Sequence, residues 1–232
     1  MQLKDVKNST FRYWLIAWSV IYLIMIIFGL LTPNSPILTC FKVGSIFLCF
    51  IYTWLTFPKD RLLQLALLTT FAADIILALN NTSELGILTF LVAQAIHTLR
   101  LNGHAAQLPL AIFTGVIIAV MSLNALLLIM PPIYLICLFY IILLITNILV
   151  SWQWQLTEPQ NPQAWGAFLG FSLFLLCDLC TGISYLALNQ AFPTFLYTPA
   201  NFFAWFFYYP SQIFLSNSSK YAIMNPKKKI VQ

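Results

Sequence analysis

Long apolar stretches separated by short polar breaks recur along the whole sequence, and they restrict the environments in which the chain can fold. Hydrophobic residues make up 61% of its 232 residues and charged residues only 7%, which excludes a soluble globular domain. A hydrocarbon layer about 30 Å thick needs roughly 20 apolar residues per helix. The sequence therefore predicts an all-α integral membrane protein with eight transmembrane helices in one bundle.

The breaks between the expected spans are rich in proline, asparagine and serine, which end helices. The spans are expected near residues 13–31, 37–57, 62–79, 85–101, 108–129, 133–150, 165–188 and 199–217. Only the break from Ser151 to Trp165 is long enough for a real loop. No second domain fits, so residues 1–232 are interpreted as a single transmembrane domain.

Lysine and arginine residues gather on one side of the expected membrane topology. Eight spans put both termini on the same side, and that side carries Lys4, Lys7, Arg12, Lys59, Arg61, Arg100, Lys220 and Lys227 to Lys229. The positive-inside rule makes this side, with both termini, cytoplasmic. We therefore expect a multi-pass protein of the plasma membrane, of bacterial type. The basic tail then indicates contact with anionic membrane lipid and not with nucleic acid.

A few ionisable side chains lie inside the expected spans, where they are costly and usually mark a site. Asp74 lies in the third span, Asp178 in the seventh, Lys42 near the start of the second and His97 late in the fourth. At about 1.5 Å per residue, Asp74 and Lys42 come out about 8 Å below the outer surface, and Asp178 and Tyr208 roughly 15 Å below it. These four groups could share one cavity. By the same count His97 lies near the cytoplasmic end, outside that cluster.

Structural roles for these residues stay open at this point. Asp74 and Lys42 could form an ion pair that only holds helices together, and His97 could be a hydrogen-bonding residue between helices. Cys177 and Cys180 have the spacing of a metal or redox pair but no second ligand pair, so they are interpreted as small buried hydrophobes. The sequence predicts no metal and no cofactor.

Five short elements follow one another on five of the expected spans. They are FKVG (residues 41–44), FAADIILAL (71–79), GILTFLVAQAIHTL (86–99), GFSLFLLCD (170–178) and YYPSQIFLSNS (208–218). In this order they resemble elements of the lysoplasmalogenases, the YhhN-like integral membrane proteins. The lysine of the first element and the aspartates of the second and fourth are present. The departures from the family pattern are Val43 for proline, Ala73 for glycine, Gln94 for histidine, His97 for tyrosine and Cys177 for serine.

The resemblance implies hydrolysis of the sn-1 vinyl ether of a lysoplasmalogen, which gives a fatty aldehyde and a glycerophospho-headgroup. The implied catalytic pair is Asp74 and Asp178. The implied substrate-binding residues are Lys42, Gln94, His97, Tyr208, Tyr209 and Gln212. The partners would be a lysophospholipid substrate and membrane lipid.

Two carboxyl groups suit this chemistry, because one can protonate the vinyl β-carbon while the other, ionised, stabilises positive charge and activates water. As a hypothesis, Asp74 near Lys42 is the base and Asp178 the acid, although the roles could be reversed. Lys42 could instead bind the substrate phosphate. Tyr208 and Gln212 are four residues apart and share a helix face, from which they could orient the ether oxygen or the water.

Two other classes of protein remain as alternatives. The departures from the family pattern would also fit a relative that has lost the chemistry and binds or translocates lysolipids. A small-solute transporter would be expected to show repeated halves with interrupted helices, and the sequence shows neither, so this class ranks last.

Overall fold

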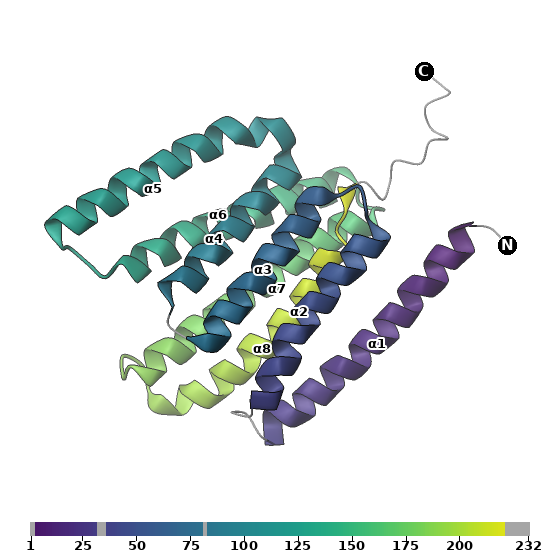
Figure 1. The fold of residues 1–232 in the computed structure, drawn as a ribbon, viewed down its shortest axis with the longest axis horizontal. Helices are drawn as coiled ribbons and strands as arrows, with labels where there is room; N and C mark the ends of the chain where they lie inside the picture. Colours follow the sequence, from purple (N-terminus) through teal and green to yellow (C-terminus); the bar gives the residue numbers. More distant parts are fainter. Residues whose placement is uncertain (1–2, 32–35, 81–82, 221–232) are drawn as a thin grey trace.

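The computed structural model describes residues 3–31, 36–80 and 83–220, and within these ranges it consists of helices and short connections (Figure 1). The α-helices are α1 (Leu3–Leu31), α2 (Pro36–Thr56), α3 (Arg61–Leu79), α4 (Glu84–Asn102), α5 (Gln107–Leu127), α6 (Pro132–Thr157), α7 (Pro162–Leu188) and α8 (Tyr197–Ser216). Two 3₁₀ turns, η1 (Gly103–Ala106) and η2 (Thr194–Leu196), precede α5 and α8. The described residues contain no strand, as an all-α fold requires.

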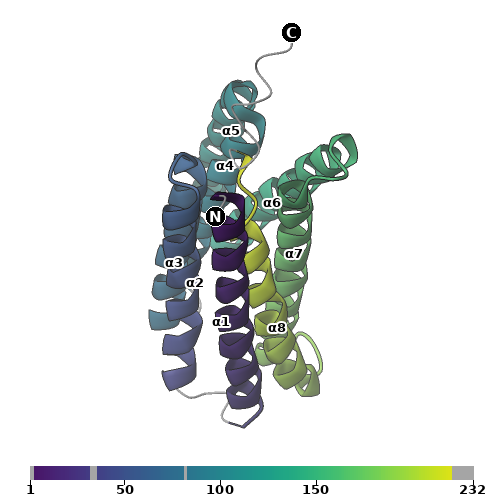
Figure 2. The same cartoon turned by 90° about the vertical axis from the view of Figure 1, so that its right-hand side faces the viewer.

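The helices lie side by side, with α1 at one edge of the bundle and α5 at the other (Figure 1). Seen from the side, α1 stands in front of the gap between the α2–α3 pair and the α7–α8 pair (Figure 2). The main apolar core is built from α4, α6, α7 and α8 around Phe139, Leu144, Phe171 and Phe174. This core holds the elements that position the polar groups described below.

Two glycines allow α7 and α8 to approach closely. A Cβ atom at Gly166 would lie 3.1 Å from the Phe214 carbonyl oxygen, and one at Gly170 would lie 2.7 Å from Leu215 Cγ. Both contacts are tighter than ordinary van der Waals distances, so a larger residue would force the helices apart. Small residues four positions apart are a recurrent way to pack helices within membranes.

A proline in α8 explains how α1 attaches to the bundle. Pro210 has no backbone N–H, so it cannot donate to the carbonyl of Phe206 one turn earlier. The Tyr22 hydroxyl of α1 donates to that carbonyl at 2.9 Å. Since unsatisfied backbone groups are costly in the membrane, this bond favours docking of α1 on α8.

Six segments of the described residues are long and apolar enough to cross a membrane. They are Tyr13–Leu31, Thr39–Thr56, Arg61–Leu79, Glu84–Leu127, Pro132–Thr157 and Pro162–Leu188. The fourth segment runs through α4, η1 and α5, and the chain reverses within it at Gly103, whose φ of +60° suits glycine (Figure 1). The helix α8 is not among the six, since asparagine, serine, glutamine and tyrosine residues interrupt its apolar sequence. The all-helical membrane fold is confirmed, whereas the structure itself identifies six candidate spans and not eight.

The prediction of a long loop between Ser151 and Trp165 is wrong. The helix α6 continues to Thr157 and α7 already begins at Pro162. Proline suits the first turn of a helix, and the Asn161 side chain caps α7 by accepting from the Gln163 N–H at 3.0 Å. The tryptophans interpreted as loop residues therefore belong to helices, as do all the glutamines of this stretch except Gln160.

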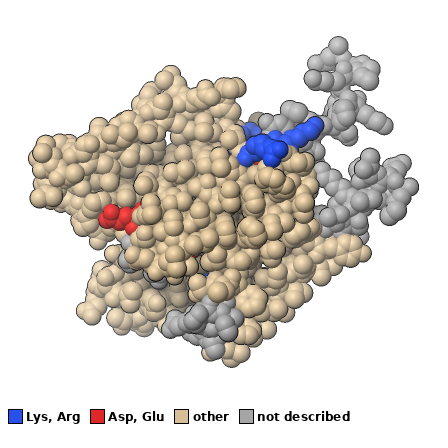
Figure 3. All heavy atoms as spheres, in the orientation of Figure 1, with Lys and Arg blue, Asp and Glu red and all other residues tan. Residues whose placement is uncertain are grey.

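Several lysine and arginine side chains gather at one end of the bundle, which also carries Asp60 and Glu158. In Figure 3 the lysine and arginine side chains gather at the end where α2 leads into α3, and acidic side chains are visible near the opposite end. Lys59 lies in that connection and Arg61 begins α3, whereas Arg100 lies in the last turn of α4 and Lys220 follows the end of α8. Glu84 begins α4 at the other end.

Candidate functional site

Asp74 of α3 and Tyr208 of α8 meet in the interior of the bundle. The Tyr208 hydroxyl donates a hydrogen bond to Asp74 Oδ2 at 2.7 Å. Both side chains are buried, with 8% and 3% of their surface exposed. The contact joins residues 134 positions apart in the sequence, and it brings together two of the residues that the sequence predicted to share a site.

Asp178 of α7 has a tyrosine partner of its own. The hydroxyl of Tyr140, on α6, donates to Asp178 Oδ2 at 2.6 Å. Tyr140 is buried and Asp178 half-buried. Sequence reasoning missed Tyr140, because a tyrosine in an apolar span resembles any packing aromatic. One signal could have found it, namely that Tyr140 lies two helical turns before Asn147 and so shares its face.

Aromatic side chains connect the two tyrosine–aspartate pairs. The Phe174 ring centroid lies 5.4 Å from that of Tyr208 and 5.8 Å from that of Phe90, which in turn lies 6.3 Å from that of Tyr140. The thiol of Cys177 interacts electrostatically with both carboxyl groups. The two pairs therefore occupy one region of the bundle, as the sequence predicted for the two aspartates.

Gln94 of α4 lies beside the Asp178 pair. Its side-chain oxygen accepts from Asn147 Nδ2 at 2.9 Å, and Asn147 Oδ1 accepts from Thr98 at 2.9 Å. The amide nitrogen of Gln94 is buried without a hydrogen-bond partner, and the same side chain interacts with Tyr140. A buried unpaired donor calls for a partner, so this side of Tyr140 is a place where a water molecule or a substrate oxygen would be held.

The other predicted site residues are distributed around this region. His97 is buried edge-on against Phe171, with ring centroids 5.0 Å apart, and its Nδ1 atom has no partner. Gln212 is buried one turn after Tyr208, and its Oε1 atom has no partner either. Tyr209 points away from the carboxyl groups and packs between Trp18 and Tyr22 of α1. The structure thus brings Tyr209 into the contact with α1 and not to the aspartates.

Lys42 of α2 is buried against the ring of Trp205, which also packs against Tyr208. Its ammonium lies 3.8 Å from the centroid of the Trp205 ring, and that ring lies 5.6 Å from the ring of Tyr208. Although both residues are described, Lys42 forms no ion pair with Asp74, and Asp74 is bonded to Tyr208 instead. The Lys42 ammonium therefore contacts an aromatic ring and does not form the ion pair with Asp74 that the sequence left open.

Among the described residues, no group of three or more His, Cys, Asp or Glu side chains could hold a metal ion. What the arrangement offers is proton chemistry: two carboxyl groups in one apolar region, each held in orientation by a tyrosine, with unpaired amide groups nearby.

Comparison with known proteins gave one match. The model of the YhhN family matches residues 37–219, a range that contains both aspartates, both of their tyrosine partners, and Lys42. No curated protein and no solved structure gave a significant match. Helix α1, which packs against Tyr209, lies before the matched residues.

Proposed function

The chain belongs to the YhhN family, and on that premise we propose that it is a membrane hydrolase that cleaves the sn-1 vinyl ether bond of lysoplasmalogens. The products would be a fatty aldehyde and a glycerophospho-headgroup. The observation that carries the proposal is the pair of intramembrane aspartates, each oriented by a tyrosine hydroxyl within 2.7 Å. Ionisable groups inside a membrane protein are costly and usually functional.

The reaction uses the two carboxyl groups in different roles. A protonated carboxyl gives its proton to the β-carbon of the vinyl ether, which leaves an oxocarbenium ion. The second, ionised carboxyl stabilises that ion and takes a proton from the attacking water. In the collapse of the resulting hemiacetal, the second carboxyl gives the proton it took from water to the departing glycerol oxygen, and the first carboxylate takes the hemiacetal hydroxyl proton. Aldehyde and alcohol leave, and both carboxyl groups return to their starting protonation states.

The surroundings suggest which aspartate takes which role. The reason for assigning Asp74 as the base was an adjacent Lys42, but Trp205 is the nearest partner of Lys42. Asp178 is half-buried, and its partner Tyr140 lies beside the unpaired amide of Gln94, where water would be held. We therefore assign the water-activating role to Asp178 and the proton-donating role to Asp74.

Deuterium labelling tests the proposed chemistry. In D₂O, the purified protein should convert a vinyl-ether lysophospholipid into an aldehyde that carries one deuterium on C2, because the added proton comes from a carboxyl group that exchanges with solvent. Mass spectrometry of the promptly trapped aldehyde measures this. The matching lysolipid with a saturated alkyl ether should release nothing, because it has no double bond to protonate. Aldehyde without deuterium would contradict the mechanism, and no aldehyde from folded protein would contradict the function.

A catalytically inactive, lysolipid-binding protein of the same fold is the second candidate. One observation favours it: His97 packs on Phe171 and is not hydrogen-bonded to either carboxyl group. In that case the alkyl and the vinyl lysolipid would both bind and neither would be cleaved.

The membrane topology is part of the proposal. We propose that α8 also crosses the membrane, and that α4 and α5 cross separately, because the chain reverses at Gly103. Eight crossings would put both termini in the cytoplasm of a plasma membrane, together with Lys59 and Arg61.

Cysteine labelling from outside the cell tests this topology. In a background without the native cysteines, a cysteine that replaces exposed Glu84 should react with a membrane-impermeant maleimide. A cysteine that replaces exposed Lys59, at the other end of the bundle, should react only after the membrane is opened. The reverse pattern would contradict the orientation.

A further inference from the structure

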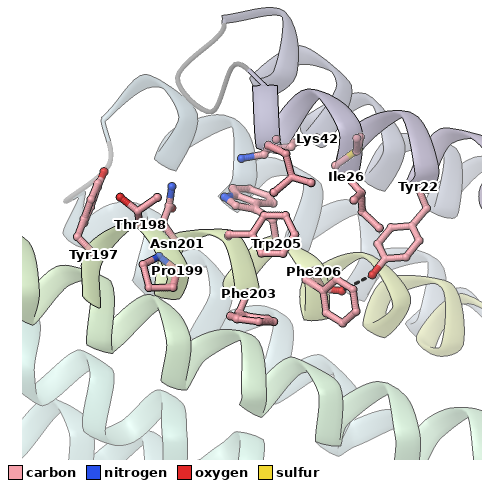
Figure 4. A pocket seen from close by; sticks show the side chains of 14 residues that line it. Tyr22, Ile26, Lys42, Tyr197, Thr198, Pro199, Asn201, Phe203, Trp205 and Phe206 are labelled. Atoms are coloured by element: carbon pink, nitrogen blue, oxygen red, sulfur yellow. Dashed lines mark hydrogen bonds between the residues drawn. The ribbon is translucent and has the colours of Figure 1, made fainter. Parts of the chain in front are cut away.

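We propose that a cavity between α1 and the start of α8 binds the phosphate headgroup of a single-chain phospholipid, with Lys42 as the phosphate ligand. The identity of the lipid rests on the proposed function, but the site is argued from the cavity itself. Its volume is about 360 Å³, within the range of small-molecule sites. Helix α1 forms one wall, the first half of α8 forms another, and Lys42 reaches in from α2 (Figure 4).

Among the described residues that line the cavity, Lys42 is the one that carries a charge. Only 8% of its surface is exposed, and its partner among the described side chains is the face of the Trp205 ring. A buried ammonium group is costly unless it is paired, and a ring face satisfies it only in part. Its three N–H donors would therefore favour an anion, and a phosphate is the anion that a phospholipid carries.

The lining is polar at one end of the cavity and apolar at the other. Figure 4 shows the Lys42 ammonium pointing toward Asn201 and Thr198, whereas Tyr22, Ile26 and Phe206 line the opposite end. This distribution matches an amphipathic molecule, with its headgroup near Lys42 and its chain along α1. Free phosphate would use the polar end alone and leave the apolar wall uncovered.

The cavity adjoins the candidate catalytic pair. Trp205 lines the cavity on one side and packs against Tyr208 on the other, with ring centroids 5.6 Å apart. Tyr208 in turn donates to Asp74. A headgroup held at Lys42 would therefore contact the same Trp205 ring that packs against Tyr208. The α1 wall lies outside the residues matched by the family model, so membership of the family does not by itself predict the cavity.

Equilibrium binding of a labelled lysophosphatidylcholine with a saturated alkyl ether chain tests the site, because this ligand binds without being cleaved. The purified full chain in detergent should bind it saturably, above its partition into protein-free micelles. Lys42→Met should weaken binding about ten- to hundred-fold, the range for losing hydrogen bonds to a charged group. Lys59→Met is the matched control, because Lys59 is exposed in the turn between α2 and α3. It should leave affinity unchanged.

A second variant, which fills the cavity and keeps Lys42, distinguishes loss of the site from misfolding of Lys42→Met. A side chain added at Gly29, which lines the cavity, would meet no atom within 4 Å of its Cβ. Gly29→Phe should therefore fill the cavity without strain and weaken binding at least ten-fold. Gly115→Phe, at an equally open position on α5, should not. Wild-type affinity in both Lys42→Met and Gly29→Phe would overturn the proposal, as would the absence of saturable binding by the wild type.

Competition binding distinguishes a phosphate carried by a lipid from a free phosphate. Unlabelled alkyl lysolipid should displace the labelled ligand, whereas glycerophosphocholine and inorganic phosphate should compete at least a hundred-fold more weakly. Equal competition by inorganic phosphate would overturn the lipid site in favour of a simple anion site. The hydrolase and the phosphate site can be contradicted independently. Binding that depends on Lys42 but comes without aldehyde release would contradict only the hydrolase. Unchanged hydrolysis and binding in both Lys42→Met and Gly29→Phe would contradict only the phosphate site.

Discussion

Replacing either Asp74 or Asp178 by asparagine should reduce aldehyde release by about 10²–10⁴-fold, the usual contribution of a general acid or base. Asparagine has nearly the same shape as aspartate and can still accept a hydrogen bond from Tyr208 or Tyr140. It cannot donate a proton to carbon or take one from water. The loss should therefore appear in kcat with little change in the binding of the uncleaved alkyl lysolipid. Initial rates of aldehyde formation measure it.

Two comparisons make this result specific. Glu84→Gln removes an exposed carboxyl group at the first residue of α4 and should keep the wild-type rate. The double variant Asp74→Asn/Asp178→Asn should be hardly slower than the worse single variant, because groups that act as a unit are not additive. If either single variant keeps more than about a third of the wild-type rate, that aspartate does not act as a general acid or base.

The sequence predicts the membrane helices for physical reasons, and it draws attention to two aspartates that the structure places among aromatic side chains inside the bundle. Segment length and apolarity place the spans, and the cost of an ionisable group in hydrocarbon draws attention to Asp74 and Asp178. Tyr208 was found because it lies one turn from Gln212 in a polar interruption of an apolar helix. The expected depths, about 8 Å for Asp74 and roughly 15 Å for Tyr208, allowed the two to share a cavity, and the structure joins them directly.

The parts that sequence reasoning missed depend on contacts between distant segments. Depth alone cannot tell that Trp205 comes between Lys42 and Tyr208, so the sequence left open both an ion pair of Lys42 with Asp74 and a phosphate-binding role for Lys42. Tyr209 follows Tyr208 directly, and successive helix residues point about 100° apart, which turns Tyr209 toward α1. The end of α6 was misjudged because tryptophan and glutamine suit an interface as well as a loop. A helix can continue beyond the hydrocarbon layer.

A polar cluster outside the candidate site holds the ends of three helices together. Arg100, at the end of α4, donates from Nη1 to the carbonyl oxygen of Ser218 at 2.9 Å and to its hydroxyl oxygen at 3.0 Å. Ser219 donates to Asp60 Oδ2 at 2.8 Å, and Asp60 Oδ1 caps α3 by accepting from the Leu63 N–H. The charges of Arg100 and Asp60 interact, and both side chains are buried.

Arg100→Leu should lower the free energy of unfolding by about 3–5 kcal/mol, because it removes two hydrogen bonds from a charged group to Ser218 and takes a positive charge away from the neighbourhood of buried Asp60. Part of that cost is the charge left on Asp60, so the double variant Arg100→Leu/Asp60→Asn should lose less stability than the two single variants added together. Lys59→Leu is the control: it removes an exposed charge beside Asp60 and should change stability by less than about 0.5 kcal/mol. Unfolding of the purified variants in mixed micelles measures all four proteins. Strict additivity would show that Arg100 acts only through the end of α8, where it binds Ser218, and not through the charge of Asp60.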